Sequence, residues 1–446
     1  MSKLFPRRAA NTALNPVLPT RLPLLYFGVA HLSLLVALAV VALDPRGVSG
    51  FFYHPRMLGV VHLITLGWIT GGILGAIHVV APLVLRVPMP VTRGDYWALA
   101  FVTIGTNGMV SHFWIETFSG MAWSAGMVVC GLLHVTIRTL VHLRSARLSG
   151  PAAVQFLLAC LNLLVAGGAG VLIAIDKVGD VIPGNALSNV YAHAHLAAVG
   201  WASMMVIVIG YRLLPVAPRD RSFYGSTILQ EVGLVGLVVS LLTGWSGTFW
   251  FGLCLVSGLG LSLAQVVWET GRLRAFPAAG VCPDFAVLQA GHALFYLVLT
   301  AGCGLVVLGS PLSAWTPSLM MLYGVLGLLG FLAQLVAAME LRLVQLLESY
   351  SLDALREFPA LGEEVRVPPV ESITGLAFTG WVVGLPVLAI GLALDRPPLV
   401  SVGAWVLLVA VAFGTLQAAL ALRPFLKQFR FWVPGPRAND TSSGHV

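Results

Sequence analysis

The chain has 446 residues, of which 58% are hydrophobic and only 10% are charged, and its formal net charge at pH 7 is +7. Soluble proteins carry about 25% charged residues, so this composition excludes an ordinary soluble globular protein. Repeated apolar runs of about 20 residues predict instead an all-α polytopic membrane protein, because a helix of that length crosses the hydrocarbon core of a bilayer.

Twelve apolar runs are predicted to be transmembrane helices. In chain order they cover residues 22–43, 57–83, 96–117, 121–143, 152–175, 190–214, 225–243, 247–268, 286–309, 317–344, 372–394 and 399–422. The first run has no small-residue cleavage site near its end, so we expect a retained span and not a signal peptide. Taken in fours, the runs predict one membrane domain of three pseudo-repeated four-helix units, at about 22–143, 152–268 and 286–422.

The distribution of basic residues predicts the orientation. With the N-terminus inside, only four of the 25 Lys and Arg residues lie outside, namely Arg46, Arg56, Lys177 and Arg396. Because basic residues concentrate in cytoplasmic connections, both termini are predicted to be cytoplasmic. The tails 1–21 and 423–446 and the acidic loop 345–371 would then face the cytoplasm. No basic run is dense enough to indicate a nucleic-acid partner, and membrane lipid is the expected surrounding.

One phrase occurs twice within the predicted spans. His62-Leu63 is followed by Gly67-Trp68 and Pro82, and the same residue types recur at the same offsets in His195-Leu196, Gly200-Trp201 and Pro215, 133 residues later. That distance covers four helices, so a third copy would fall in the tenth run. That run is glycine-rich but lacks His, Trp and Pro at the matching places, which predicts a purely structural remnant there.

The histidines separate by depth. An imidazole inside a span has no water to satisfy it, so such residues are functional candidates. With the predicted orientation, His62, His112, His193 and His195 share a layer in the outer third. Positions 193 and 195 differ by about 200° around a helix, so these two rings leave it on opposite sides and can serve two cofactors flanking one helix.

Two neutral imidazoles from different helices can hold the iron of a low-spin heme. His62 and one of His193 and His195 are therefore predicted to clamp such a heme, while the other faces a second heme or metal site. His112 is a weaker metal candidate, because it lies four residues before Glu116 and the two can form a simple interfacial pair. For every one of these histidines, the alternative is an interhelical hydrogen bond.

The other polar residues in the spans carry weaker expectations. Glu231 and Glu340 lie in the inner halves of their spans and either carry protons inward or line a wet crevice. The remaining intramembrane histidines are expected to be structural or to face headgroups: His31, His78, His134, His142 and His292.

The segment His193-Ala194-His195-Leu196, with Gly200-Trp201, Gly210-Tyr211 and Leu214-Pro215, resembles subunit I of the heme–copper oxidases. It is most similar to the C-family oxidases, the nitric oxide reductases and the NnrS-like membrane heme proteins. The resemblance implies twelve helices in three groups of four, one or two b-type hemes in the outer third, and a bacterial inner membrane. It also implies that His62 and His195 ligate the low-spin heme and that His193 faces the second site.

The chain departs from that family in two ways. The His-x-His motif lies on the sixth span and not on the tenth, and the seventh span has no histidine. The chain also lacks a His-His dipeptide, so the usual copper site is not expected. What remains implied is electron transfer or redox chemistry on nitric oxide or another diatomic gas, with a separate cytochrome c or quinol as donor. Any enzyme would be an oxidoreductase of this type, and no catalytic residue is predicted.

Two other functions fit the same residues. The first is a heme-free transporter whose outer histidines form a proton or metal-ion site, since internal repeats are common in transporters. The second is a non-catalytic membrane subunit or sensor whose histidines only stabilise the bundle. A visible heme spectrum would separate both from the heme hypothesis.

Overall fold

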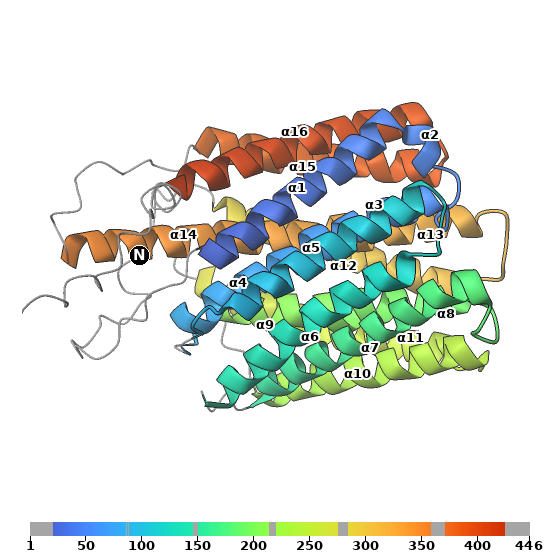
Figure 1. Ribbon diagram of the computed structural model, residues 1–446, viewed down its shortest axis with the longest axis horizontal. Coiled ribbons are helices and arrows are strands. Elements are labelled where there is room, and N and C mark those ends of the chain that lie inside the picture. The colour runs from blue at the N-terminus through green and yellow to red at the C-terminus, as the bar shows by residue number, and fades with distance from the viewer. Residues whose placement is uncertain are drawn as a thin grey trace, which may run out of the picture.

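The computed structural model describes residues 21–85, 87, 89–145, 150–213, 220–274, 284–357 and 371–423. These residues form long helices that run side by side, with no strand among them (Figure 1). In chain order the elements are α1 (Arg21–Leu43), α2 (Pro45–Val48), α3 (Pro55–His62), η1 (Leu63–Thr70), α4 (Gly71–Leu83), α5 (Arg93–Trp114), α6 (Met121–Ser145), α7 (Pro151–Gly179), α8 (Ala186–His195), η2 (Leu196–Ser203), α9 (Met204–Leu213), α10 (Asp220–Thr243), α11 (Thr248–Arg274), α12 (Phe285–Gly309), α13 (Thr316–Val325), η3 (Leu326–Ala333), α14 (Gln334–Glu357), α15 (Glu371–Ala393) and α16 (Pro397–Ala421). The predicted all-α class is confirmed.

Eleven helical stretches of the described chain are long and apolar enough to cross a membrane. Each coincides with one of the predicted runs, so the fold is that of a polytopic membrane protein. The remaining run corresponds to α5, which has 22 residues but is not among the eleven. Arg93, Asp95 and Asn107 lower its hydropathy, and its crossing stays a prediction.

The tenth helix is longer than the sequence predicts. α14 continues to Glu357, well into the segment 345–371 that was expected to be a loop. Its residues 345–357 are rich in Leu and Glu and contain no Pro or Gly, so nothing in the sequence ends the helix there. The rest of that loop, the tails 1–20 and 424–446, and Pro215 of the second phrase lie outside the described residues.

Three of the long helices contain a π-helical segment of eight residues. These are η1, which joins α3 to α4, η2, which joins α8 to α9, and η3, which joins α13 to α14. Each segment begins with Leu, has Gly at its fifth place and an aromatic residue at its sixth: Leu63, Gly67 and Trp68; Leu196, Gly200 and Trp201; Leu326, Gly330 and Phe331. The first two segments directly follow His62 and His195, and the third follows Val325. Such π segments frequently occur at functional sites.

The three π segments contact one another pairwise, which places them together inside the bundle. Trp68 Nε1 of η1 donates to the Ala333 carbonyl of η3 at 3.1 Å. Trp201 Nε1 of η2 donates to Thr70 Oγ1 of η1 at 3.2 Å. Both bonds therefore run from the sixth residue of one segment to the eighth residue of another.

No tryptophan is available for a corresponding bond from η3 to η2. Phe331 is the sixth residue of η3 and has no N–H group, and Ser203 is the eighth residue of η2. The Ser203 hydroxyl donates instead to the Ala198 carbonyl of its own segment at 2.8 Å. Two of the three inter-segment contacts thus contain a tryptophan hydrogen bond, and among the described residues no such bond joins η2 to η3.

The glycine at the fifth place allows another helix to approach. A Cβ atom at Gly67 would lie 2.3 Å from the Cβ of Ser33 on α1, a distance that real Cβ atoms do not adopt. A Cβ at Gly200 would lie 2.7 Å from Asn162 of α7, and one at Gly330 would lie 2.8 Å from Tyr296 of α12. Glycine is required at all three places because each π segment packs directly against the preceding long helix.

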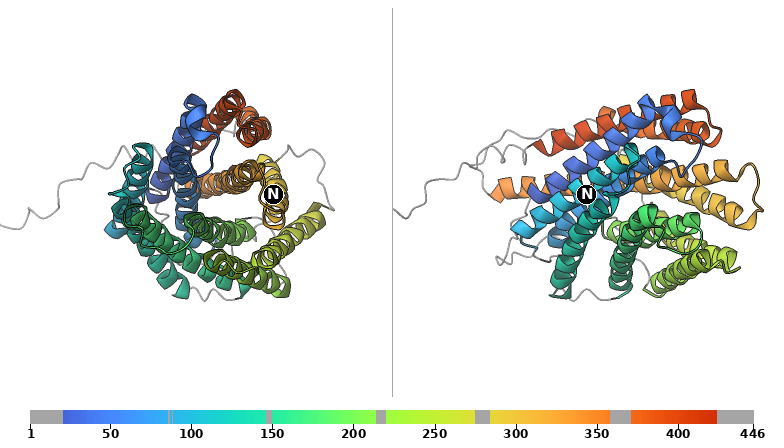
Figure 2. Two further views of the ribbon diagram at one scale, coloured as in Figure 1. Left: turned by 90° about the vertical axis from the view of Figure 1, so that its right-hand side faces the viewer. Right: turned by 45° about the vertical axis from the view of Figure 1, so that its right-hand side comes forward.

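The remaining helices surround the π segments. α5 pairs with α6, α10 with α11, and α15 with α16. α6 also contacts α7, α11 contacts α12, and α16 contacts α1. Contacts of α7 with α10, of α12 with α15 and of α1 with α5 join these three groups, so the outer contacts form a closed circuit. The end-on view shows the helices arranged around a common axis (Figure 2).

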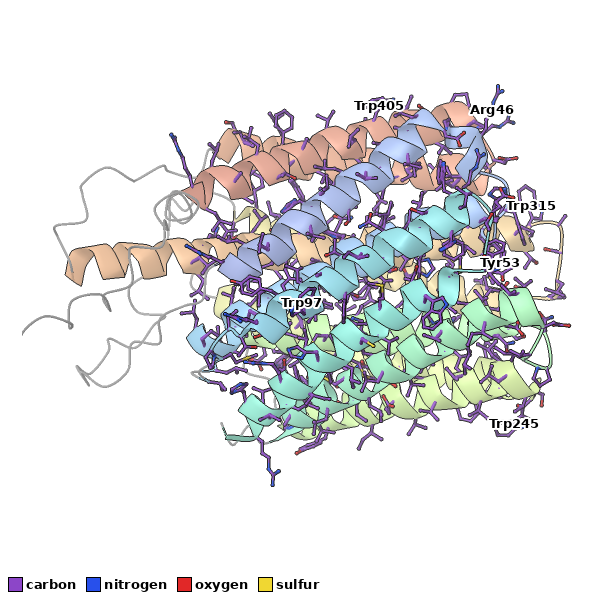
Figure 3. All side chains as sticks on the ribbon, viewed as in Figure 1. Arg46, Tyr53, Trp97, Trp245, Trp315 and Trp405 are labelled. Carbon is purple, nitrogen blue, oxygen red and sulfur yellow. The ribbon has the colours of Figure 1, made fainter. Side chains whose placement is uncertain are left out.

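Aromatic residues gather at the end of the bundle that was predicted to be outer. Trp245, Trp315, Tyr53 and Arg46 all lie at that end in Figure 3. Trp315 is 66% exposed and Trp123 is 82% exposed. Exposed tryptophans at helix ends are typical of a bilayer interface, where the ring is apolar and the N–H group reaches water or headgroups.

Candidate functional site

The three histidines predicted to be cofactor ligands lie beside the first two π segments. His62 is the last residue of α3, directly before η1, and His195 is the last residue of α8, directly before η2. His193 lies two residues earlier on α8. Each of the three side chains keeps part of its surface accessible although it packs within the bundle.

All three rings are held in the same way, through Nδ1. The bonds join His62 to the Leu58 carbonyl at 2.7 Å, His193 to the Ala166 carbonyl at 3.0 Å, and His195 to the Tyr191 carbonyl at 2.8 Å. A carbonyl oxygen can only accept, so Nδ1 carries the proton in each ring and Nε2 of the neutral imidazole keeps its lone pair. Histidines that ligate metals are oriented by this kind of second hydrogen bond.

His62 and His193 lie on different helices, and the two imidazoles are near enough for their charges to interact. Phe113 of α5 lies against His62, with ring centroids 5.1 Å apart. Gly170 of α7 lies against His193, and a Cβ atom there would be 3.1 Å from the ring. Among the described residues, no side chain bonds to the Nε2 atom of either histidine. Two imidazole lone pairs are therefore left without a protein partner in one region.

His195 has a different neighbour. Its Nε2 atom accepts a hydrogen bond from the Tyr323 hydroxyl of α13 at 3.1 Å. The two rings are stacked, with centroids 6.0 Å apart and planes inclined by 25°. His193 and His195 thus contact different helices, as expected for positions about 200° apart on one helix. The two sides of α8 offer two separate histidine environments.

His112 is bound within its own turn. Its Nδ1 atom donates to the Thr117 carbonyl at 2.6 Å. Glu116 has a φ of 54°, in the left-handed region, and the expected pairing of His112 with Glu116 is not formed. A Cβ atom at Gly120 would lie 2.5 Å from Nε2, so this glycine covers the other ring nitrogen. His112 therefore closes the turn between α5 and α6.

Two of the four basic residues predicted to lie outside, Arg56 and Lys177, have protein partners. Arg56 bonds to Asp44 at 2.8 Å and lies over the Trp114 ring, 5.4 Å from its centroid. Lys177 bonds to the Tyr53 hydroxyl at 3.0 Å and also lies over the Phe118 ring. These contacts anchor the connections on the side of the bundle where His62 and His193 lie.

Three of the histidines outside this outer layer bond to side chains. His31 Nε2 bonds to Glu340 at 2.8 Å, although 309 residues separate them in sequence. His134 bonds to Asp95 at 3.1 Å, and His292 bonds to Gln334 at 2.9 Å. The His31–Glu340 pair was not predicted. The only sequence signal was that each residue is ionisable and lies within an apolar run.

His78 and Glu231 each have a local partner. His78 bonds through Nδ1 to the Leu74 carbonyl at 2.8 Å and stacks on Tyr26 of α1. Glu231 of α10 accepts from the Asn162 amide at 3.0 Å. Both therefore support helix packing, which agrees with the structural alternative for His78.

Asp95 lies at the start of α5, before the predicted span, and forms the hub of a polar cluster. Its carboxylate accepts from the Thr92 backbone N–H at 2.7 Å, and Arg138 and His134 approach it at 3.1 Å. Burial opposes ionisation, but the bonds from Thr92, the Arg138 charge and the bond from His134 together hold the pKa of Asp95 below its ordinary value. The cluster ties α5 to α6 at the inner end.

The fold and the histidine pair define a class: a polytopic helical bundle with two open imidazole lone pairs between helices. Among the described residues, no group of three or more His, Cys, Asp or Glu side chains is placed to hold a metal ion. Two imidazoles are what an iron needs when a porphyrin supplies its other four nitrogens. Comparison with protein-family models and with curated proteins finds no match for this chain.

Proposed function

We propose that this chain is a heme-binding integral membrane protein of the bacterial inner membrane that acts in electron transfer or in redox chemistry on a diatomic gas. One observation carries the proposal. The rings of His62 and His193, on separate helices, are each oriented through Nδ1 by a backbone carbonyl, so that Nε2 is free, and the two are near enough for their charges to interact. These are the requirements for a pair of axial ligands to a b-type heme.

The proposed ligands differ from those that the family resemblance implies. The resemblance pairs His62 with His195 and assigns His193 to the second site. The geometry favours His62 with His193, because the lone pair of His195 already accepts from Tyr323. We therefore assign the low-spin site to His62 and His193, and a second site to His195 and Tyr323.

Each side chain has a definite part in this proposal. A bound heme would supply a one-electron redox centre. The Leu58 and Ala166 carbonyls hold the two rings in the ligating tautomer, and Phe113 packs against His62. On the other side of α8, the Tyr323 hydroxyl holds a proton beside His195. A second heme or metal on His195 would require this hydroxyl to turn away, and that would open a site for a gas.

The architecture implied by the resemblance is part of the proposal. It has twelve crossings in three units of four, with α5 as the additional crossing, and both termini in the cytoplasm. Three findings support it: a π segment occurs in the second long helix of each unit, its glycine packs on the first, and the outer contacts form a closed circuit. The concentration of Lys and Arg at one end supports the orientation.

The test is optical. The protein is purified in detergent from heme-replete cells, and oxidised and dithionite-reduced spectra are recorded with and without CO. Sharp reduced b-type bands support the heme proposal. A shift of the bands on addition of CO supports a second, open site at His195. Bands that do not change with CO favour a protein that acts in electron transfer only. A colourless preparation contradicts the proposal and favours the heme-free transporter.

A further inference from the structure

The His31–Glu340 pair lies beside a cavity in the half of the bundle predicted to be inner. Its Nε2–Oε1 distance is 2.8 Å, and both side chains are nearly buried. The other ring nitrogen of His31 contacts Thr415 Oγ1 of α16 at 2.8 Å, and the edge of His31 meets Trp68 of η1. Four elements, α1, η1, α14 and α16, therefore enclose one ionisable pair.

The cavity extends from this pair toward the inner ends of the helices. Its lining runs from His31, near the middle of α1, to Phe285 at the start of α12 and Ala421 at the end of α16. Polar side chains occur along it, namely Gln289, Gln345, Gln417 and Thr374. Gln417 Oε1 is buried and has no hydrogen-bond partner within the described chain. The rest of the lining is mostly apolar, but a buried acceptor without a partner, close to other polar side chains, is a place for a water molecule.

The volume of the cavity indicates which molecules it can hold. Its volume is about 70 Å³. An engineered cavity of about 150 Å³ binds benzene, whereas about 10–15 Å³ of such space is enough for one water. The cavity therefore has room for a few waters and has about half the volume of the one that binds benzene. Water and a protonatable pair together make a path for protons.

We propose that His31 and Glu340 form a proton-binding site that exchanges protons with the inner aqueous phase through this cavity. The charged pair and the neutral pair contain the same number of protons. One further proton, taken from the cavity water, gives an imidazolium beside a neutral carboxyl, and its release to the same water reverses the step. The site lies apart from His62, His193 and His195, and it does not depend on heme.

Other ionisable groups on the packed elements have their own partners or lie outside this lining. Asp284 of α12 pairs with Arg342 of α14, and His292 of α12 bonds to Gln334. Tyr26 of α1 stacks on His78 of α4. Arg21 begins α1, Arg423 follows α16, and neither lines the cavity. Within the described chain, His31 and Glu340 are the ionisable groups that line it.

Infrared spectroscopy on the purified full-length protein tests the site. We expect a protonated-carboxyl C=O band that grows as the pH falls and shifts when H₂O is replaced by D₂O. Glu340→Gln should remove it, whereas Glu231→Gln, the matched change at the other intramembrane carboxylate, should leave it. A missing band, or one that survives Glu340→Gln, overturns the proposal.

A variant that fills the cavity tests the proton path and leaves His31 and Glu340 unchanged. A Cβ atom at Gly414, which lines the cavity, would meet no atom within 4 Å, so Gly414→Leu has room to fill it. It should slow hydrogen–deuterium exchange of the carboxyl by at least about tenfold. Gly260→Leu is the control, because Gly260 is equally open but exposed on α11. Unchanged exchange in Gly414→Leu contradicts the path, whatever the heme spectra show.

Discussion

His62 and His193 in the outer layer and His31 deeper in the bundle use the same side chain in opposite ways. His62 and His193 are held by backbone carbonyls through Nδ1 and leave Nε2 open. His31 engages a carboxylate and a threonine hydroxyl, so both of its ring nitrogens are occupied by side chains. A backbone carbonyl orients a ring without competing for its lone pair, whereas a carboxylate makes the ring part of an ionisable pair. The difference separates ligand candidates from proton-binding candidates.

The largest effect is expected from removing the imidazole ring of His62 or of His193. His62→Ala or His193→Ala should abolish the low-spin b-type spectrum, because iron that loses one of two axial ligands no longer has a bis-histidine site. His195→Ala should retain that spectrum, and His112→Ala serves as a control for a change in the same layer. Reduced-minus-oxidised spectra of matched preparations decide the matter. Loss of the spectrum in His195→Ala but not in His193→Ala would restore the pairing that the resemblance implies.

Breaking the inner pair should instead affect stability. Glu340→Ala leaves His31 buried without its ionic partner, and breaking a buried pair costs about 3–5 kcal/mol. His62→Ala in heme-free protein removes one side-chain bond to a carbonyl and should cost only about 1 kcal/mol. Thermal unfolding in detergent, followed by circular dichroism, measures both. Equal losses for the two variants would remove the distinction between the two kinds of histidine.

A substitution at Tyr323 tests His195, whose Nε2 lone pair accepts a hydrogen bond from the Tyr323 hydroxyl. Tyr323→Phe removes the hydroxyl that donates to Nε2 and should change stability by about 1 kcal/mol or less. If His195 can hold a second heme or metal, we expect the freed nitrogen to increase the CO-sensitive fraction of the spectrum. CO titration of Tyr323→Phe against the unmodified protein is the measurement. A smaller CO response would show that Tyr323 supports that site.

The last prediction concerns Asp95, the hub of the inner cluster of α5 and α6, whose effect is limited to a range of pH. Its pKa is held below the ordinary value, so its contribution is present above the unfolded-state pKa of about 3.9 and is lost as the pH falls through the folded-state value. Asp95→Asn should therefore cost about 1–2 kcal/mol at neutral pH, and the difference should vanish in acid. Unfolding midpoints of both proteins across this pH range test it. A cost that grows in acid would contradict the assignment.

The sequence predicted the helices because apolar runs bounded by charges are a strong signal. It predicted a matched pair of helices from the phrases at His62 and His195. In the tenth run it predicted only a structural remnant, because His, Trp and Pro are absent there. The π segment of that run shares instead Leu, Gly and an aromatic ring with the other two, as in Leu326, Gly330 and Phe331.

The partners of individual side chains could not be predicted from the sequence. Whether His62 meets His193 or His195 depends on how each helix is turned about its axis, and the apolar pattern of a fully embedded helix does not fix that rotation. The pair of His31 with Glu340 joins residues 309 apart. No local spacing rule connects them, so only the packed bundle brings them together.

The tryptophan bonds between the π segments also determine where the bundle can open. They link η2 to η1 and η1 to η3, and Phe331 offers no N–H to link η3 back to η2. Turning η1 about its axis therefore breaks both bonds, whereas within the described chain no tryptophan bond joins η3 directly to η2. The helices that contain η2 and η3 are joined instead by the Tyr323–His195 bond. A molecule that enters the second site would have to displace this bond, so the same tyrosine hydroxyl that occupies the His195 lone pair also controls entry between these helices.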